Sequence, residues 1–188
     1  MSLAPPSSFD PLAYPLDPAW FERPDGIHGL AHTRRVLIHA TRIARARDLD
    51  PDWFHSLVLA CAWHDIGRTH DGREPEHGRQ SVARARQLGL DEQVEPLILR
   101  RALFAVEWHS LPDARAVARA VTLAREGSKP EVGTMLRVLW VLKDADGLDR
   151  VRLKDLDPDQ LRYPCAKAMV AQAWRLLAEI PDPERILP

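Results

Sequence analysis

The most continuous apolar stretch of the chain is Leu57–Trp63, and the pair His64-Asp65 follows it directly. The surrounding residues 51–68 have the length of a helix and show no polar stripe, so the pattern predicts a helix that is buried on all sides. Asp50 is typical of the residue that caps such a helix. The pattern therefore places an imidazole and a carboxylate in the interior, where an ionised aspartate is costly unless a cation neutralises it.

Six other stretches repeat apolar residues at helical spacing, and each predicts a helix. They are residues 27–48, 75–88, 91–109, 114–124, 131–148 and 164–180. Arginines surround the apolar positions of the first and fourth of these stretches and are expected to form solvated faces. No stretch alternates apolar and polar residues over the length of a strand, which predicts an all-α, single-domain helical bundle.

The first 18 residues contain five prolines, a density that forbids a regular helix. We expect them to form an extended segment that wraps the surface of the protein. The predicted organisation is a Pro-rich N-terminal lead-in, residues 1–26, followed by one domain, residues 27–188.

The composition is that of an ordinary soluble globular protein, with 45% hydrophobic and 28% charged residues. The formal net charge of -1 gives no reason to expect nucleic acid as a partner. No apolar stretch approaches the roughly 20 residues of a membrane span, and the N-terminus lacks the features of a signal peptide. We therefore expect a cytoplasmic protein without a membrane partner, in which Cys61 and Cys165 are reduced.

Histidine or aspartate lies toward one end of five predicted helices. The residues are His32, His64, Asp65, His77, His109 and Asp146. Imidazole and carboxylate together suit a divalent ion such as Mn, Fe, Co, Ni or Zn, whereas oxygen ligands alone would suit Mg or Ca. His28 precedes His32 by four residues and shares its helical face, where we expect it at the rim of a site. His39, His55 and His70 are interpreted as surface or half-buried histidines.

Three phrases of the sequence resemble, in content and order, the HD-domain superfamily of metal-dependent phosphohydrolases. They are His32-Thr33-Arg34-Arg35-Val36, Ala62-Trp63-His64-Asp65-Ile66-Gly67 and Lys143-Asp144-Ala145-Asp146-Gly147-Leu148-Asp149. The resemblance implies that one metal is bound by His32, His64, Asp65 and Asp146. Asp144 and Asp146 point about 200° apart on a helix, so only one can face the metal. The family register favours Asp146 and leaves Asp144 as a capping or supporting residue.

The extra histidines, His77 and His109, resemble those of HD proteins that hold two metals bridged by the carboxylate of the His-Asp pair. Asp65 would then be the bridge. Two such ions can bind a phosphoryl group between them and lower the pKa of a water toward neutrality. The resemblance thus implies one or two divalent ions and hydrolysis of a phosphoester or phosphoanhydride of a nucleotide or another small phosphorylated metabolite.

Basic residues near the predicted ligands are expected to bind the substrate's phosphate, because guanidinium groups bind phosphate oxygens in bidentate fashion. The candidates are Arg35, Arg68, Arg79, Lys143 and Arg150. The predicted catalytic residues are Asp65, Arg68 and Lys143, with Arg68 the first choice for substrate contact. Nucleotidases of the family that have a Glu three positions after the Asp have a candidate general acid there, whereas this chain has Arg68.

Two other functions are compatible with the same pattern. Some HD-fold proteins with six such ligands are di-iron oxygenases that cleave C–H bonds with dioxygen. A non-catalytic ligand sensor is the second alternative, against which the complete set of ligand candidates argues.

Overall fold

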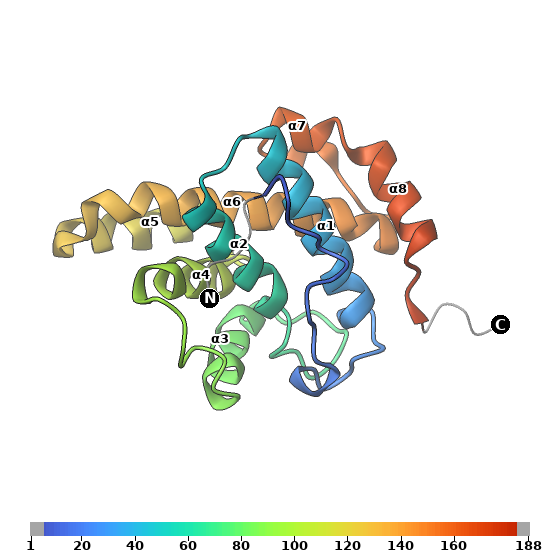
Figure 1. Ribbon diagram of the computed structural model, residues 1–188, viewed down its shortest axis with the longest axis horizontal. Coiled ribbons are helices and arrows are strands. Elements are labelled where there is room, and N and C mark those ends of the chain that lie inside the picture. The colour runs from blue at the N-terminus through green and yellow to red at the C-terminus, as the bar shows by residue number, and fades with distance from the viewer. Residues whose placement is uncertain (1–5, 184–188) are drawn as a thin grey trace.

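The computed structural model describes residues 6–183, except for the side chains of residues 127–131, and all regular structure in this range is helical (Figure 1). The α-helices are α1 (Leu30–Ala46), α2 (Pro51–Trp63), α3 (His77–Gln87), α4 (Pro96–Trp108), α5 (Asp113–Leu123), α6 (Lys129–Asp149), α7 (Pro164–Lys167) and α8 (Val170–Glu179). Short 3-10 turns lie at Pro18–Trp20, Arg150–Leu153 and Pro158–Gln160, and a π-helical turn, Ala124–Ser128, joins α5 to α6. The predicted all-α fold is confirmed.

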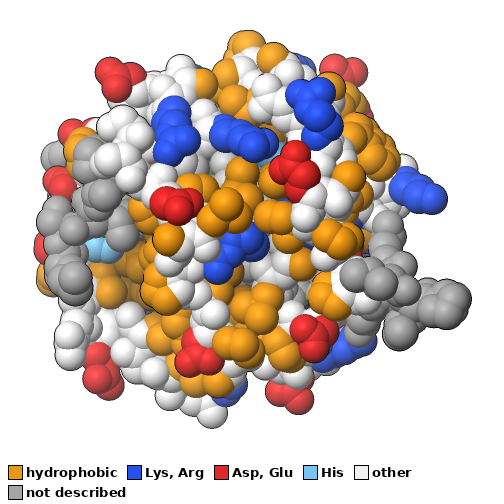
Figure 2. Space-filling view, turned by 45° about the vertical axis from the view of Figure 1, so that its right-hand side comes forward, with side chains coloured by type: hydrophobic (Ala, Val, Ile, Leu, Met, Phe, Trp, Pro, Cys, Tyr) orange, Lys and Arg blue, Asp and Glu red, His pale blue; other side chains and the backbone are white. Residues whose placement is uncertain are grey.

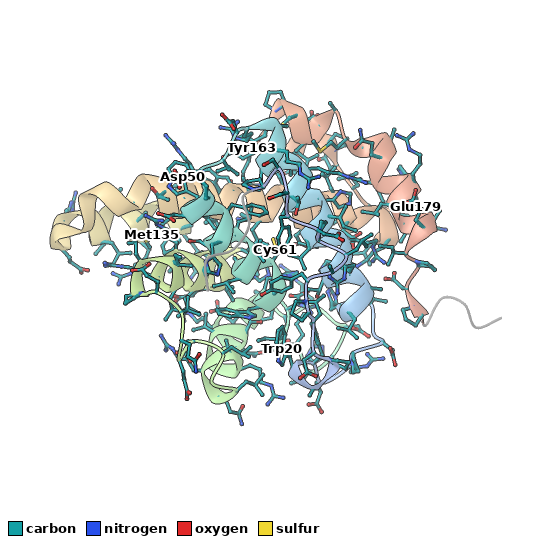
Figure 3. All side chains as sticks on the ribbon, viewed as in Figure 1. Trp20, Asp50, Cys61, Met135, Tyr163 and Glu179 are labelled. Atoms are coloured by element: carbon teal, nitrogen blue, oxygen red, sulfur yellow. The ribbon has the colours of Figure 1, made fainter. Side chains whose placement is uncertain are left out.

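Helices α1, α2, α4 and α6 form the centre of the bundle, because each packs against at least two of the others. Within α2, Leu57–Trp63 is buried throughout, as the apolar pattern predicts. Cys61 lies at the centre of the bundle (Figure 3), and burial raises the pKa of its free thiol. The remaining helices cover this centre: α3 packs on α4, α5 on α6, and α7 and α8 on α1 and α6.

Two of the central helices end at a histidine. The side chain of Asp50 accepts a hydrogen bond from the backbone N of Asp52 and so caps the start of α2, as predicted. His64 is the residue that ends α2, and His109 ends α4 in the same way. Because each histidine follows a helix packed into the core, its imidazole is carried into the interior.

Two predicted helices differ from the structure by more than a few residues. α4 begins at Pro96 rather than at residue 91, because the side chain of Glu95 accepts hydrogen bonds from two backbone N–H groups of the first turn. The predicted helix 164–180 is divided into α7 and α8. Neither difference moves the helix ends that carry the candidate ligands.

The Pro-rich segment lies along α1, where two arginines hold it. Arg34 and Arg45 donate hydrogen bonds of 2.5–2.8 Å to four backbone oxygens of this segment. Phe9 is buried against Phe54 of α2, with 5.1 Å between the ring centroids. The prediction that the arginines of α1 form a solvated face is therefore wrong for Arg35, which is completely buried, whereas Arg45 is exposed while it holds the lead-in.

The surface carries charges of both signs. On the face that Figure 2 shows, Lys and Arg side chains are interspersed with Asp, Glu and hydrophobic side chains, and neither sign forms a large continuous area. This distribution agrees with the formal net charge of -1. In the part of the chain that the structure describes, no helix combines the length and hydrophobicity needed to cross a membrane.

His39 on α1 is completely buried, so its interpretation as a surface or half-buried histidine is wrong. Neither ring nitrogen has a hydrogen-bond partner within residues 6–183, and burial lowers the pKa of His39 to about 4. The same side chain in the unfolded protein has a pKa of about 6.5. The unfolded state therefore binds more protons between these values, and the native state should lose stability as the pH falls through this window.

Replacing His39 by leucine should flatten this pH dependence. In metal-free protein, we expect the loss of unfolding free energy between pH 7 and pH 5 to be about 2 kcal/mol smaller in His39→Leu than in the unaltered protein. Urea denaturation at the two pH values measures the difference. His70→Gln, at an exposed histidine, is the control and should keep the full loss. Equal losses in the unaltered protein and His39→Leu would contradict the prediction.

Candidate metal centre

His32, His64 and Asp146 meet where α1, α2 and α6 come together. The Nε2 atoms of His32 and His64 are 3.0 Å apart, and Asp146 Oδ1 lies 3.5 Å from His32 Nε2. Both imidazoles are completely buried, whereas Asp146 is partly exposed. One potential ligand atom from each residue lies within 4.8 Å of the other two, so the three could hold one ion.

His77 and His109 form a second group with Asp65. The Nε2 atoms of the two histidines are 2.8 Å apart, and Asp65 Oδ1 lies 3.1 Å from His77 Nε2 and 3.7 Å from His109 Nε2. His77 is the first residue of α3 and His109 follows α4, and these two helices pack together. The packing of α3 on α4 thus brings together two histidines that are separated by 32 residues.

Asp65 lies between the two groups and faces both. Its Oδ2 atom is 3.4 Å from His32 Nε2 and 3.6 Å from His64 Nε2, whereas its Oδ1 atom faces His77 and His109. Burial raises the pKa of Asp65, whereas positive charge at the surrounding histidine positions, His64 foremost, lowers it well below its usual range. One oxygen of the carboxylate is directed to each pair of histidines.

The second nitrogen of each imidazole has an acceptor in the protein. Nδ1 of His64, of His77 and of His109 lies 2.5–2.8 Å from a backbone carbonyl oxygen, and Nδ1 of His32 lies 2.7 Å from Asp149 Oδ2. Because a carbonyl oxygen or carboxylate accepts, Nδ1 carries a proton, and in the neutral imidazole Nε2 then presents a lone pair. Hydrogen bonds of this kind orient histidine ligands in metal sites.

The facing lone pairs indicate that cations fit both groups. Two unprotonated nitrogens at 2.8–3.0 Å repel each other, and a cation bound by both removes the repulsion. Burial lowers the pKa of His64 to about 3, which keeps this imidazole neutral. Asp65 Oδ1 is buried and accepts no hydrogen bond from the described residues, a costly arrangement without a cation. Imidazole and carboxylate donors together suit divalent transition metals.

The comparison with protein-family models matches the HD domain to residues 29–151. The chain belongs to the HD domain family. HD domains form a superfamily of metal-dependent hydrolases, and the matched range includes all six candidate ligands. Searches of curated proteins and of solved structures found no match to the chain.

Asp144 and Asp146 both lie on α6 of the HD domain, but their side chains have different partners. Asp144 is buried and accepts hydrogen bonds from the backbone N atoms of Arg162, at 2.9 Å, and Tyr163, at 2.8 Å. It therefore holds the segment that leads into α7. Asp146 is the carboxylate that reaches His32.

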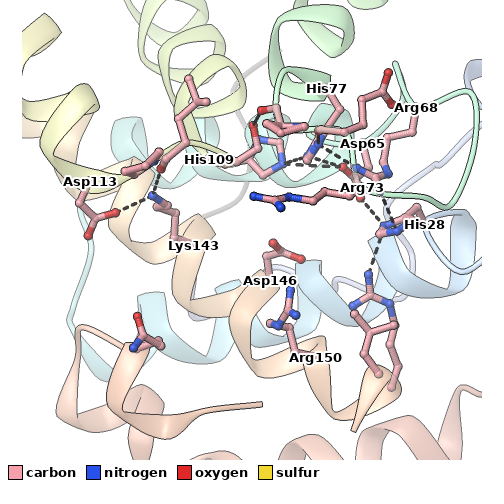
Figure 4. A pocket seen from close by; sticks show the side chains of 18 of the residues that line it. His28, Asp65, Arg68, Arg73, His77, His109, Asp113, Lys143, Asp146 and Arg150 are labelled. Carbon is pink, nitrogen blue, oxygen red and sulfur yellow. Dashed lines mark hydrogen bonds and ion pairs between the residues drawn. The ribbon is translucent and has the colours of Figure 1, made fainter. Parts of the chain in front are cut away.

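A cavity of about 1180 Å³ opens beside both ligand groups of the HD domain (Figure 4). The basic residues in its wall are Arg68, Arg73, Arg115, Lys143, Arg150, Arg152 and Arg162. Three of the predicted phosphate-binding candidates, Arg68, Lys143 and Arg150, are in this set. Arg35 is buried elsewhere, and Arg79 is exposed between two glutamates, so neither contributes to the wall in the described part of the chain.

Arg68 contacts two histidines at one side of the cavity. Its Nη2 atom lies 3.1 Å from His28 Nε2, and His28 Nδ1 lies 3.0 Å from Asp65 Oδ2. Arg68 can thus donate to His28, which donates to Asp65 and fixes the orientation of its carboxylate. Arg68 Nη1 lies 2.8 Å from His77 Nδ1, which already donates to a carbonyl oxygen, so Nη1 needs another acceptor.

Lys143 lies at the opposite side of the cavity (Figure 4). Its Nζ atom donates hydrogen bonds to the backbone O of Leu111, at 2.6 Å, and to Asp113 Oδ1, at 2.5 Å. Burial lowers the pKa of Lys143, and the hydrogen bond to Asp113 opposes this effect. Because an ammonium group has three N–H donors, one remains for a ligand.

The sequence interpretation missed the group that supports His32. Asp149 accepts from His32 Nδ1 and also binds the guanidinium of Arg35, with 2.6 Å between Arg35 Nε and Asp149 Oδ1. Arg35 Nη2 in turn lies 2.7 Å from Asp182 Oδ1, and all four side chains are buried. The sequence did contain a signal for the role of Asp149, because Asp149 follows Asp146 by three residues and so shares its side of the helix. The contact with Asp182 has no local signal in the sequence.

Proposed function

We propose that this HD domain protein is a metal-dependent phosphohydrolase that holds two divalent ions and cleaves a phosphoester or phosphoanhydride of a small phosphorylated metabolite. The observation that carries the proposal is the orientation of Asp65, whose two oxygens face two different pairs of histidines. A carboxylate in this orientation can be shared by two ions. Mn, Fe, Co, Ni and Zn all suit such a donor set.

Each residue of the centre has a separate part in this proposal. His32, His64 and Asp146 would hold one ion, His77 and His109 the other, and Asp65 both. When bound, a pair of divalent ions supplies positive charge to phosphoryl oxygens and lowers the pKa of water. His28 keeps Asp65 oriented, while Arg68 Nη1 and the remaining N–H of Lys143 donate hydrogen bonds to substrate oxygens from opposite sides of the cavity.

The charge of the cavity supports an anionic substrate. Its wall contains seven Arg or Lys side chains and six carboxylates, two of which, Asp65 and Asp146, are candidate ligands. Two divalent ions would make the site strongly positive, and arginine is well suited to bind phosphate oxygens. This charge favours a phosphorylated substrate over an uncharged one.

The side chains of the cavity wall also indicate which chemical group carries the phosphate in the substrate. No Phe, Tyr or Trp is among the described residues of the wall, so a nucleobase would find no aromatic ring to stack on. Opposite Arg68, the wall offers hydrogen-bonding groups such as Asp113, Gln160 and Arg162. Such groups suit hydroxyls, which supports a sugar or polyol phosphate over a nucleotide.

Metal reconstitution tests the proposal. The purified protein is stripped with a chelator and reloaded with Mn, Fe, Co, Ni or Zn, and metal per chain is measured by elemental analysis. Hydrolysis of an aryl phosphate, a sugar phosphate panel and a nucleotide panel is then followed by phosphate release. We expect close to two ions per chain, phosphate release with at least one metal, faster turnover of sugar phosphates than of nucleotides, and background rates after chelation.

Other outcomes would indicate the alternative functions. Two irons per chain with dioxygen consumption and no phosphate release would replace the proposal with the oxygenase. Specific binding of a phosphorylated ligand without turnover in any metal would replace it with the sensor. Failure to bind metal under all loading conditions would overturn the proposed centre itself.

A further inference from the structure

The loop between α2 and α3 directs one arginine into the cavity. Arg73 lies in the middle of this loop, residues 69–76, and its side chain points into the space between Asp65 and Asp146 (Figure 4). The residue itself is exposed, so it is not part of the hydrophobic core. The role of a long charged side chain in this position is not explained by packing.

The backbone on both sides of Arg73 is hydrogen-bonded to the metal centre. The carbonyl oxygen of Gly72 accepts from Arg68 Nη2 at 2.9 Å, and that of Glu74 accepts from His77 Nδ1 at 2.5 Å. Farther along the loop, the Ser110 hydroxyl donates to the carbonyl oxygen of Pro75 at 2.8 Å. The loop is therefore fixed to the same residues that surround Asp65, and Arg73 is held over the centre.

Arg73 also differs from the other cations of the wall in its charge environment. Five of them have a carboxylate within 3.9 Å, and these are Arg115, Lys143, Arg150, Arg152 and Arg162. Arg68 has no carboxylate partner among residues 6–183, but its Nη2 atom is already bonded to His28 and to Gly72 O. For Arg73, no hydrogen bond or ion pair is formed with any residue in the described part of the chain. Its guanidinium retains all of its donors.

A free guanidinium over this centre is placed to bind an anion. Two divalent ions carry four positive charges, and the two carboxylates that face the cavity from the centre, Asp65 and Asp146, compensate only two of them. Arg73 would then be repelled by the loaded centre unless an anion lay between. A phosphoryl group satisfies both sides, because its oxygens can face the ions and also accept two parallel hydrogen bonds from a planar guanidinium.

We infer that Arg73 is a substrate-binding residue, which binds the phosphoryl oxygens of the substrate from the loop side of the cavity. This inference rests on the proposed phosphohydrolase function and adds a residue to it. It identifies the loop 69–76 as the part of the protein that contacts the transferred phosphoryl group, with Arg73 supplying the bidentate contact.

Phosphate binding by metal-loaded variants tests the inference. Inorganic phosphate is titrated calorimetrically into the unaltered protein, Arg73→Ala, Arg73→Lys and the control Arg79→Ala, and kcat and KM for an aryl phosphate are measured on the same preparations. We expect Arg73→Ala to weaken phosphate binding and lower kcat/KM by about 10- to 100-fold, with metal content unchanged. The phosphate affinity and kcat/KM of Arg73→Lys should lie between those of Arg73→Ala and the unaltered protein, because lysine keeps the charge without the bidentate geometry. Arg79→Ala should match the unaltered protein, since Arg79 is exposed and lies outside the cavity wall.

The outcomes separate this inference from the proposed function. If the unaltered protein binds phosphate and Arg73→Ala binds it within twofold as tightly, the inference about Arg73 is wrong and the function stands. A loss of metal in Arg73→Ala that accounts for its loss of phosphate binding would show a structural role instead, and would also overturn the inference. An unaltered, metal-loaded protein that neither binds phosphate nor releases it from an ester would overturn the proposed function, and this inference with it.

Discussion

Replacing Asp65 by alanine is expected to reduce the bound metal from near two ions per chain to less than one and to bring phosphate release to background. The reason is that Asp65 directs Oδ2 to His32 and His64 and Oδ1 to His77 and His109. Without it, one ion would keep a single carboxylate ligand and the other would keep only neutral imidazoles, which hold a divalent cation less well. Elemental analysis and the aryl phosphate assay on one preparation measure both effects.

Two control variants sharpen this test. His77→Ala removes a ligand from one group only and should keep about half of the metal. Asp159→Ala removes an exposed carboxylate of the same cavity wall and should keep all of it. Equal metal content in Asp65→Ala and His77→Ala would contradict the bridging role.

Asp149→Asn is expected to lower both the stability of the metal-free protein and the affinity of the centre for metal. Asp149 is buried with three partners, Arg35, His32 and Arg152. Removing its charge leaves the guanidinium of Arg35 with Asp182 as its remaining carboxylate. Because breaking a buried ion pair costs 3–5 kcal/mol, and Asp182 compensates in part, we expect a loss of about 3 kcal/mol. Loss of the carboxylate from His32 Nδ1 should weaken metal binding by about 10- to 100-fold.

Urea denaturation of the metal-free protein and metal titration measure these two effects separately. Asp155→Asn is the matched control, because it breaks the ion pair with Arg150, in which both side chains are about half exposed, and should cost about 1 kcal/mol or less. The pH dependence of stability gives a further test. Burial opposes the ionisation of Asp149, but His32 and Arg35 hold its pKa below the ordinary value. The contribution of Asp149 to the stability of the folded protein is therefore present above about pH 4 and is lost as the pH falls below this value. A loss in Asp149→Asn no larger than that in Asp155→Asn would contradict the proposed support of His32.

The parts of the fold that could be predicted are those specified by neighbouring residues. The apolar run Leu57–Trp63 and its cap at Asp50 define α2 and its buried end. The run that ends at His109 does the same for the end of α4. The start of α4 was missed because the combination of Glu95 with Pro96 outweighs the weaker signals at residue 91. Apolar runs and caps therefore predicted which residues lie at helix ends. Together with the order of the HD-family motifs, they predicted which of these residues come together in the structure.

The parts that could not be predicted depend on residues far apart in the sequence. Arg35 was expected on a solvated face or at the substrate's phosphate, because its partners Asp149 and Asp182 lie 114 and 147 positions later. His39 shares a helix face with the apolar residues Val36 and Ile43, a signal for burial that the interpretation of His39 did not use. Arg73 stands in a polar loop like any surface arginine. Its position over the cavity depends on hydrogen bonds from α3 and from the end of α2, which the sequence pattern does not reveal.

The link from His32 through Asp149 and Arg35 to Asp182 has a consequence for the order in which the protein is made. His32, on the first α-helix to be synthesised, depends on a carboxylate that is added 117 residues later, and the hydrogen bonds of Arg35 are complete only when residue 182 has followed. A nascent chain that has completed α1 and α2 exposes His32, His64 and Asp65 without Asp146 or the support of His32. Because metal binding is coupled to folding, we expect the centre to take up its ions only after the C-terminal segment has been translated and has docked on α1.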